Sequence, residues 1–297
     1  MSRTFHGAAG NRLVATEMGA AGRPVVLLHG GGQTRHAWAR TARRLAEAGY
    51  HAVAFDQRGH GDSEWVADGA YAFPDYALDA AAVAGRVAAE QGAKPVAIGA
   101  SLGGIASLLA QDLGEEAPFA GLILVDVVPR MDPRGVAHIQ TFMRARAEEG
   151  FASVEEAAEA VAAYLPHRPR PTSLDGLKKN LRHHPDGRWR WHWDPRFLDG
   201  PRPVNAAWER VERDAEAIAR RLTVPTLLVR GGQSELVSEA AAQAFLARVP
   251  GAEYVDVAEA RHMVAGDRND VFGDAILRFL HAHFGAGVAA RPARRHG

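Results

Sequence analysis

Short, continuous runs of aliphatic and β-branched residues recur along the chain, and this pattern constrains the fold more than any other feature. Each run is bounded by Gly, Pro or Asp, which is typical of strands buried on both faces of a parallel sheet. Helical segments separate the early runs, so the pattern predicts a doubly wound α/β sheet. The predicted strands are Val25–Leu28, Ala52–Phe55, Val96–Ile98, Leu122–Val125, Thr226–Val229 and Tyr254–Val257.

Helical periodicity is found in Thr34–Ala48, Asp79–Gln91 and Leu102–Leu113. Before the first buried run, Thr4–His6 and Leu13–Glu17 are spaced for an antiparallel hairpin, with glycines in the turn between them. The sheet is therefore predicted to begin with a hairpin and to continue with parallel strands.

The alternation of strands and helices stops between about residues 129 and 222. This stretch contains amphipathic helical pieces and proline-rich joints, and it is too long for one crossover connection. We expect an inserted helical cap over the carboxyl edge of the sheet, where α/β proteins bind ligands. The predicted division is a core of residues 1–128 and 222–290, a cap of residues 129–221, and a basic tail of residues 291–297.

The composition excludes several classes of protein. The 297 residues carry equal numbers of acidic and basic side chains, which does not suit a nucleic-acid-binding protein. No apolar run is long enough for a transmembrane helix, so no membrane partner is expected. The absence of cysteine excludes disulfides, thiolate metal sites and a cysteine nucleophile, and it is compatible with the cytoplasm.

The strongest chemical signal is the segment Gly99-Ala100-Ser101-Leu102-Gly103, which follows a predicted strand and opens a predicted helix. In this context G-x-S-x-G is a nucleophile elbow, in which small flanking residues allow a tight turn and the serine projects from the helix N-terminus. Ser101 is the predicted nucleophile.

A second signal, His29-Gly30-Gly31-Gly32, directly follows the first buried run. Acyl transfer requires backbone N–H groups directed at the oxyanion, and glycines allow the backbone to approach a substrate closely. We expect the N–H groups of Gly31 and Leu102 to form an oxyanion hole, with Gly30 against the substrate.

Taken in order, these segments, the motif Asp56–Ser63 and the late His262 resemble the α/β-hydrolase superfamily. The resemblance extends from about residue 25 to residue 280, apart from the cap, and implies a mostly parallel eight-stranded sheet flanked by helices. It is similar in particular to the subgroup of esterases, lactonases, C–C bond hydrolases and cofactor-free haloperoxidases. The resemblance also implies that Asp56–Ser63 is a structural turn beside the site.

A serine hydroxyl needs an adjacent base, and His262 follows the last predicted strand, where the order Ser…acid…His requires it. Two residues are candidates for the acid that orients His262. Asp126 ends the strand Leu122–Val125, and Glu235 follows the strand Thr226–Val229. Superfamily members use either position, and the later one, that of Glu235, is commoner. The run ending in Val127-Val128-Pro129 resembles members that use the earlier strand, and Glu at 235 departs from the usual Asp, so the balance slightly favours Asp126.

In the predicted cap, Trp189 and Trp191 alternate with arginines, and both are candidates for contact with an aromatic or anionic substrate. The alternative is that these tryptophans only pack the cap onto the core.

The resulting hypothesis is a serine hydrolase that cleaves a small carboxylic ester, lactone or amide through an acyl-enzyme. No cofactor and no metal is expected, the partner is a small-molecule substrate, and a homodimer is compatible with the sequence. The alternatives are a C–C bond hydrolase of aromatic degradation, a cofactor-free haloperoxidase or perhydrolase, and a non-catalytic ligand receptor on the same fold.

Overall fold

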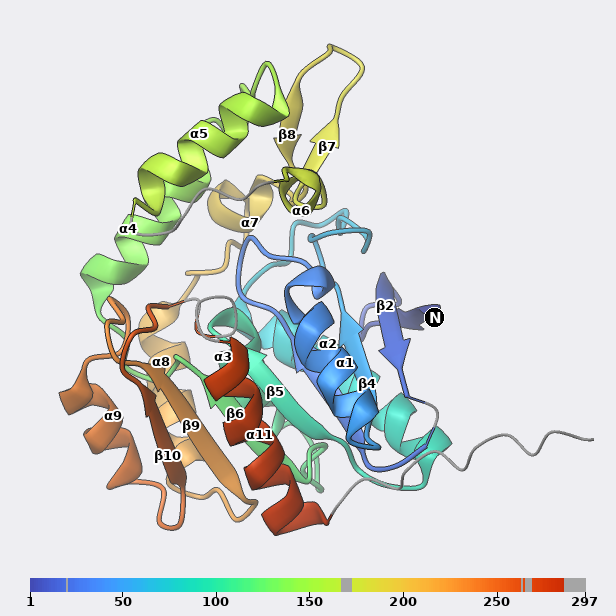
Figure 1. Cartoon of the computed structure of the whole chain (residues 1–297), viewed down its shortest axis with the longest axis vertical. Coiled ribbons are helices and arrows are strands. Elements are labelled where there is room, and N and C mark those ends of the chain that lie inside the picture. Colours follow the sequence, from blue (N-terminus) through green and yellow to red (C-terminus); the bar gives the residue numbers. More distant parts are fainter. Residues whose placement is uncertain (20, 167–172, 263, 265–268, 286–297) are drawn as a thin grey trace, which may run out of the picture.

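The computed structural model describes residues 1–19, 21–166, 173–262, 264 and 269–285. Its centre is an eight-stranded sheet (Figure 1). In spatial order the strands are β1 (Ser2–His6), β2 (Arg12–Met18), β4 (His51–Phe55), β3 (Pro24–Leu28), β5 (Val96–Ala100), β6 (Gly121–Val125), β9 (Thr226–Gly231) and β10 (Glu253–Val257).

The first two strands form the predicted antiparallel hairpin, and β2 also runs antiparallel to β4. All other pairs in this sheet are parallel. The neighbouring strands β3 and β4 are buried along their whole length, because helices cover both faces. The predicted fold class and the six predicted strands are therefore confirmed.

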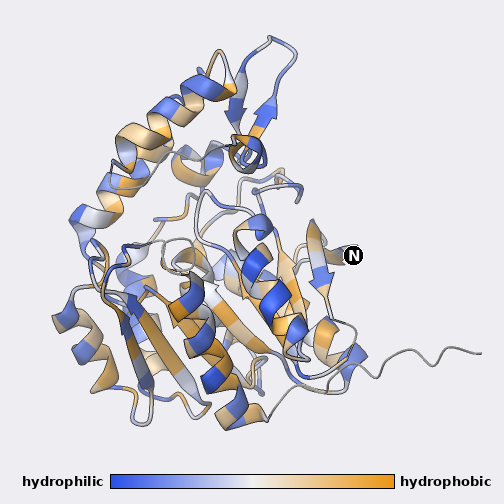
Figure 2. Cartoon of the chain, in the orientation of Figure 1, coloured by the Kyte–Doolittle hydropathy of each residue, from blue (hydrophilic) through white to orange (hydrophobic). Residues whose placement is uncertain are grey.

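The helices cover the sheet in two layers, each with its own hydrophobic cluster. One cluster contains residues from α1 (Ala39–Glu47) and α11 (Asn269–Phe284). The 3₁₀ helix η1 (Arg35–Trp38) directly precedes α1. The cluster on the other face contains residues from α2 (Phe73–Gln91), α3 (Leu102–Ala110), α8 (Trp208–Ala219) and α9 (Glu239–Leu246). Figure 2 shows the resulting pattern of hydrophobic strands at the centre and amphipathic helices outside.

Residues 129–166 and 173–207 lie above this core, at the upper end of the view in Figure 1. Helix α8, which the sequence placed in the cap, packs against α3 of the core. The elements above the core are α4 (Pro133–Arg144), α5 (Val154–Tyr164), α6 (Asp175–Lys178), β7 (Leu181–His183), β8 (Trp189–Trp191) and α7 (Arg196–Asp199).

The expectation of a cap without strands is wrong at one place, because β7 and β8 form a two-stranded antiparallel sheet. The connection contains Asp186-Gly187, and Gly187 has a φ of +79°, a conformation that glycine adopts without strain. An Asp-Gly pair between alternating strands is a hairpin signal, so the signal was present in the sequence.

Side-chain caps begin three helices that flank the carboxyl edge of the sheet. Asp132 accepts a hydrogen bond from Arg134 N–H at the start of α4, and Ser153 accepts one from Glu156 N–H at the start of α5. Ser238 does the same at the start of α9. Such caps satisfy N–H groups that have no partner within the helix, and they determine where the chain turns into these helices.

Candidate active site

Ser101 lies on the sharp turn between β5 and α3, with φ 46° and ψ −112°. This is an unfavourable backbone conformation for a residue with a side chain, and such strain is concentrated at functional sites. The turn is possible because its neighbours are glycines: a Cβ at Gly103 would lie 2.4 Å from Leu28 O, and a Cβ at Gly99 would lie 2.5 Å from Gly103 O. The sharp strand-to-helix turn that was expected at Ser101 is therefore present in the structure.

Asp126 follows β6 and is fully buried. Its Oδ2 accepts a hydrogen bond of 2.8 Å from Nδ1 of His262, whose side chain is 16% exposed. Because Nδ1 donates to this carboxylate, the neutral imidazole has an unprotonated Nε2 that is available as a base. The structure thus brings together His262 and one of its two candidate acids.

The end of β9 and the loop after it contribute two further donors to the same carboxylate. Gly231 N–H donates to Asp126 Oδ1 at 2.9 Å, and the Ser234 hydroxyl donates to Oδ2 at 2.6 Å. Ser234 Oγ in turn accepts from the N–H groups of Leu236 and Val237, so its proton is left for Asp126. The sequence reasoning missed Ser234, whose signal is only its place in the loop that carries the rival acid.

Glu235, the second candidate acid, lines the same cavity as His262, but its environment differs. Its Oε2 is buried and has no hydrogen-bond partner in the described part of the chain. Burial, with a smaller contribution from Glu235, raises the pKa of Tyr164 to about 12. Glu235 thus lines the cavity near Tyr164 of the cap, whereas Asp126 accepts the hydrogen bond from the imidazole of His262.

The glycine loop after β3 lies against the nucleophile, since a Cβ at Gly30 would be 3.5 Å from Ser101 Cβ. Gly31 and Leu102 both line the cavity beside Ser101. Among the hydrogen bonds of the described residues, neither the Gly31 N–H nor the Leu102 N–H is a donor. Two backbone donors are therefore available next to the serine, as expected for an oxyanion hole.

A cavity of about 700 Å³ opens above Ser101 and His262, between the core and the cap. Trp191 and Trp193 line it, and their rings stack with centroids 5.0 Å apart. Trp189 is not among the described residues that line the cavity; its ring lies on His183, with centroids 4.8 Å apart. Most other lining residues are apolar, including Phe73, Met131, Val136, Ile139, Phe142, Met143, Val161, Leu165, Leu177, Phe197, Leu198, Val204, Trp208 and Leu236.

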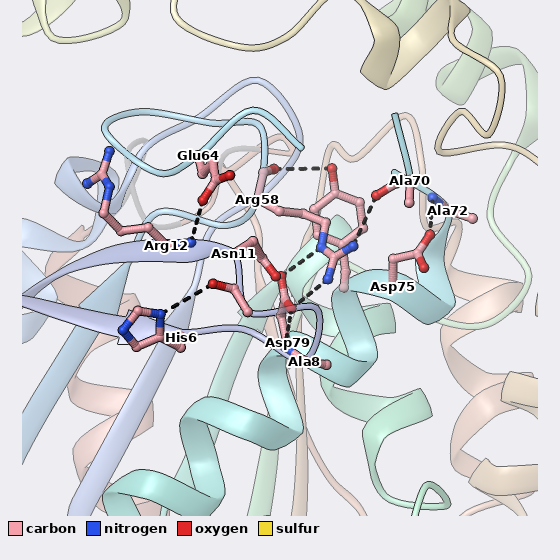
Figure 3. Close-up of polar contacts among 12 residues, drawn as sticks. His6, Ala8, Asn11, Arg12, Arg58, Glu64, Ala70, Ala72, Asp75 and Asp79 are labelled. Atoms are coloured by element: carbon pink, nitrogen blue, oxygen red, sulfur yellow. Dashed lines mark hydrogen bonds and ion pairs between the residues drawn. The ribbon is translucent and has the colours of Figure 1, made fainter. Parts of the chain in front are cut away.

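The segment Asp56–Ser63 is held by buried charges. Arg58 forms a bidentate ion pair with Asp79, at 2.7 Å and 2.6 Å, and donates to Ala70 O at 3.1 Å (Figure 3). Asp56 accepts hydrogen bonds from Arg35 and from Asp62 N–H. These contacts fit the structural role that was expected for the segment.

The described helices include none that is long and apolar enough to cross a membrane. Within the described residues, no group of three or more His, Asp or Glu side chains is arranged to hold a metal ion.

The fold and these residues define a class of protein. A strained serine between strand and helix, a histidine–aspartate pair after later strands, and an eight-stranded α/β sheet with a cap are the features of an α/β-hydrolase superfamily serine hydrolase. Residues 20–269 match the model of the family described as serine aminopeptidase, S33. The chain belongs to this family.

Individual proteins show the same similarity. The chain is 32% identical to an esterase of Mycobacterium tuberculosis, over 76% of this chain and 71% of the esterase. It is 28% identical to a 3-hydroxybutyrate-oligomer hydrolase of Cupriavidus necator, over 85% and 87% of the two chains. The crystal structure of E-2-(acetamidomethylene)succinate hydrolase superposes with a TM-score of 0.80 at 22% identity, covering 94% of this chain and 98% of that one, which shows the shared fold.

Proposed function

We propose that this protein cleaves carboxylic esters through an acyl-enzyme formed on Ser101. The observation that carries the proposal is the His262–Asp126 hydrogen bond of 2.8 Å, made by a histidine that lines the same cavity as the strained serine. A serine hydroxyl becomes a competent nucleophile only beside a base, and that base must present the correct ring nitrogen.

In the proposed mechanism, Ser101 Oγ attacks the ester carbonyl while His262 Nε2 takes the hydroxyl proton. The Asp126 carboxylate stabilises the imidazolium, and the N–H groups of Gly31 and Leu102 donate to the oxyanion of the tetrahedral intermediate. His262 then protonates the leaving alcohol oxygen as the C–O bond breaks. A water molecule, activated by His262, attacks the acyl-enzyme, and the acid leaves as Ser101 regains its proton.

The cavity supports a substrate with a substantial apolar group. Its volume of about 700 Å³ exceeds what a small ester such as an acetate needs, and its walls are mainly aliphatic and aromatic. The two relatives that match most of this chain are named as an esterase and as an oligomer hydrolase, which supports hydrolysis. The C–C hydrolase, haloperoxidase and receptor alternatives are not favoured by these relatives.

The nucleophile can be tested with a fluorophosphonate probe, which labels activated serines covalently. The wild-type protein should be labelled, and Ser101→Ala should not be. Ser107, which lies on the same helix but is fully buried, provides the matched control: Ser107→Ala should be labelled like the wild type. Equal labelling of the wild type and Ser101→Ala would contradict the proposed function.

A further inference from the structure

Three buried histidines lie side by side below the cap. The ring centroids of His29 and His60 are 5.3 Å apart, and those of His60 and His192 are 5.8 Å apart. His29 and His60 come from core loops, whereas His192 directly follows β8 of the cap. Their side chains are almost completely excluded from solvent.

Backbone hydrogen bonds at both ring nitrogens determine the tautomer of each histidine. His29 accepts from Gln57 N–H at Nε2 (3.0 Å), so its Nδ1–H donates to Gly30 O (2.8 Å). His60 accepts from Gly32 N–H at Nε2 (3.1 Å), so its Nδ1–H donates to Arg58 O (2.9 Å).

His192 has the opposite tautomer. It accepts from Gly61 N–H at Nδ1 (2.6 Å), and its Nε2–H donates to Gly32 O (3.2 Å). Burial, followed by the neighbouring His60, lowers the pKa of His192 well below that of an exposed histidine, which keeps the ring neutral. The cap ring therefore bridges two core loops, the glycine loop after β3 and the segment Asp56–Ser63.

Together the rings hold three successive peptide groups of the glycine loop. His29 holds the C=O of Gly30, His60 holds the N–H of Gly32, and His192 holds the C=O of Gly32. Because a trans peptide directs N–H and C=O to opposite sides, holding Gly30 O also sets the direction of the Gly31 N–H. Gln33 closes the start of the loop, because its N–H donates to Gly30 O at 3.1 Å and its Oε1 accepts from Gly30 N–H at 3.1 Å. Gly32, at a φ of +73°, has no side chain to restrict it, so the contacts from His60 and His192 hold this end of the loop.

Other contacts seat the same part of the cap on the core. Asp194 N–H donates to Gly59 O at 2.9 Å, and the Arg182 guanidinium donates to Gly61 O. The Tyr71 hydroxyl donates to Asp194 Oδ2 at 2.6 Å. The segments before and after His192 are therefore both attached to the core, which limits how far the His192 ring can move.

We propose that His192 is a positioning residue through which the cap holds the oxyanion loop in its active geometry. The proposal rests on the proposed function, because it assumes that the Gly31 N–H stabilises the oxyanion. Oxyanion donors act by being preorganised, and loss of one donor costs about 10²–10³ in kcat. A donor that is displaced but still present should lower kcat by a smaller factor.

The test compares His192→Phe, which keeps a ring but removes both hydrogen bonds, with His192→Gln, whose amide offers one acceptor and one donor. His183→Phe, at an exposed position of the same hairpin, is the matched control. For His192→Phe we expect kcat and the affinity for an alkyl boronic acid, which forms an oxyanion-like adduct with the serine, to fall together by about 10–100-fold. KM should stay close to the wild-type value, and His192→Gln should recover part of the loss.

A His192→Phe protein with wild-type kcat and boronic acid affinity would overturn the proposal, as would a change in KM alone. A second measurement needs no variant: ¹⁵N NMR of the wild-type ring nitrogens should show neutral Nε2–H for His192 and neutral Nδ1–H for His29 and His60. A different tautomer or an imidazolium at His192 at neutral pH would also overturn it. Failure of the proposed function would look different, because the wild type would then neither cleave esters nor bind the boronic acid.

Discussion

Asp126 and Glu235 follow neighbouring strands of the sheet, and their hydrogen bonds separate their roles. The Asp126 carboxylate accepts from His262, Ser234 and Gly231, whereas the buried Glu235 Oε2 has no hydrogen-bond partner among the residues that the structure describes. These three hydrogen bonds hold the Asp126 carboxylate against the imidazole, where a carboxylate stabilises the imidazolium. The loop that carries the rival acid therefore supplies the donors that orient Asp126.

This difference predicts how the two carboxylates respond to amidation. Asp126→Asn should lower kcat by about 10³-fold or more, because an amide can present its NH₂ to His262 and select the wrong tautomer. Glu235→Gln should retain kcat of the wild-type order, since the imidazole Nδ1 is held by Asp126 and not by Glu235. Steady-state hydrolysis of a p-nitrophenyl ester measures both, and a larger loss for Glu235→Gln would refute the assignment of the acid.

At the scale of elements, helix α4 supplies a large part of the apolar lining of the cavity. Val136, Ile139, Phe142 and Met143 line it from this helix, and the Phe142 ring stacks on Tyr164 of α5 with centroids 4.0 Å apart. Their spacing of three and four residues places them on one face of the helix. The cap thus presents an apolar wall to any substrate that reaches Ser101.

The apolar wall predicts a dependence on acyl chain length. From acetate to longer p-nitrophenyl esters, kcat/KM should rise by at most about fourfold per methylene, because burying one CH₂ is worth about 0.8 kcal/mol. The rise should end once the cavity is filled. Ile139→Trp, which adds volume to the wall, should move the optimum to shorter esters, and an acetate optimum in the wild type would show that the cavity does not bind the acyl chain.

At the scale of the whole molecule, the buried histidines link stability to pH. Burial lowers the pKa of His29 to about 4 and that of His60 to about 3. In the unfolded chain both would protonate near pH 6.5, so below that pH the unfolded state binds protons that the folded state does not. The free energy of unfolding should therefore fall as the pH is lowered from 6.5 towards 4.

The expected slope is about 1.4 kcal/mol per pH unit for each histidine, within the window between its two pKa values. Urea unfolding at pH 7 and pH 5.5, which stays above the range in which most carboxylates titrate, measures the effect. His60→Gln should show a shallower pH dependence than the wild type because one titrating group is removed. Equal stability of the wild-type protein at the two pH values would contradict the prediction.

Much of this molecule was predictable because its signals are local. The buried runs become strands wherever continuous β-branched residues meet helices on both faces, and the small residues Gly99 and Gly103 allow the tight turn at Ser101 between strand and helix. The alternation of Trp and Arg is typical of a short strand, but its pairing with β7 was not predicted, although Asp186-Gly187 marks the turn. In the sequence, Trp189 and Trp191 were equal candidates for contact with a substrate. Of these two residues, Trp191 lines the cavity and Trp189 does not.

The sequence by itself determined the individual strands, the tight turn at Ser101 and the place of His262 after the last strand, because each depends on residues close together in the chain. Only the tertiary structure selected Asp126 over Glu235 as the partner of His262, since that choice depends on where two loops meet. It also showed that His192 of the cap holds Gly32 of the core, 160 residues away. Hydrogen bonds of this kind have no local pattern, because their geometry exists only after the sheet and the cap have packed together.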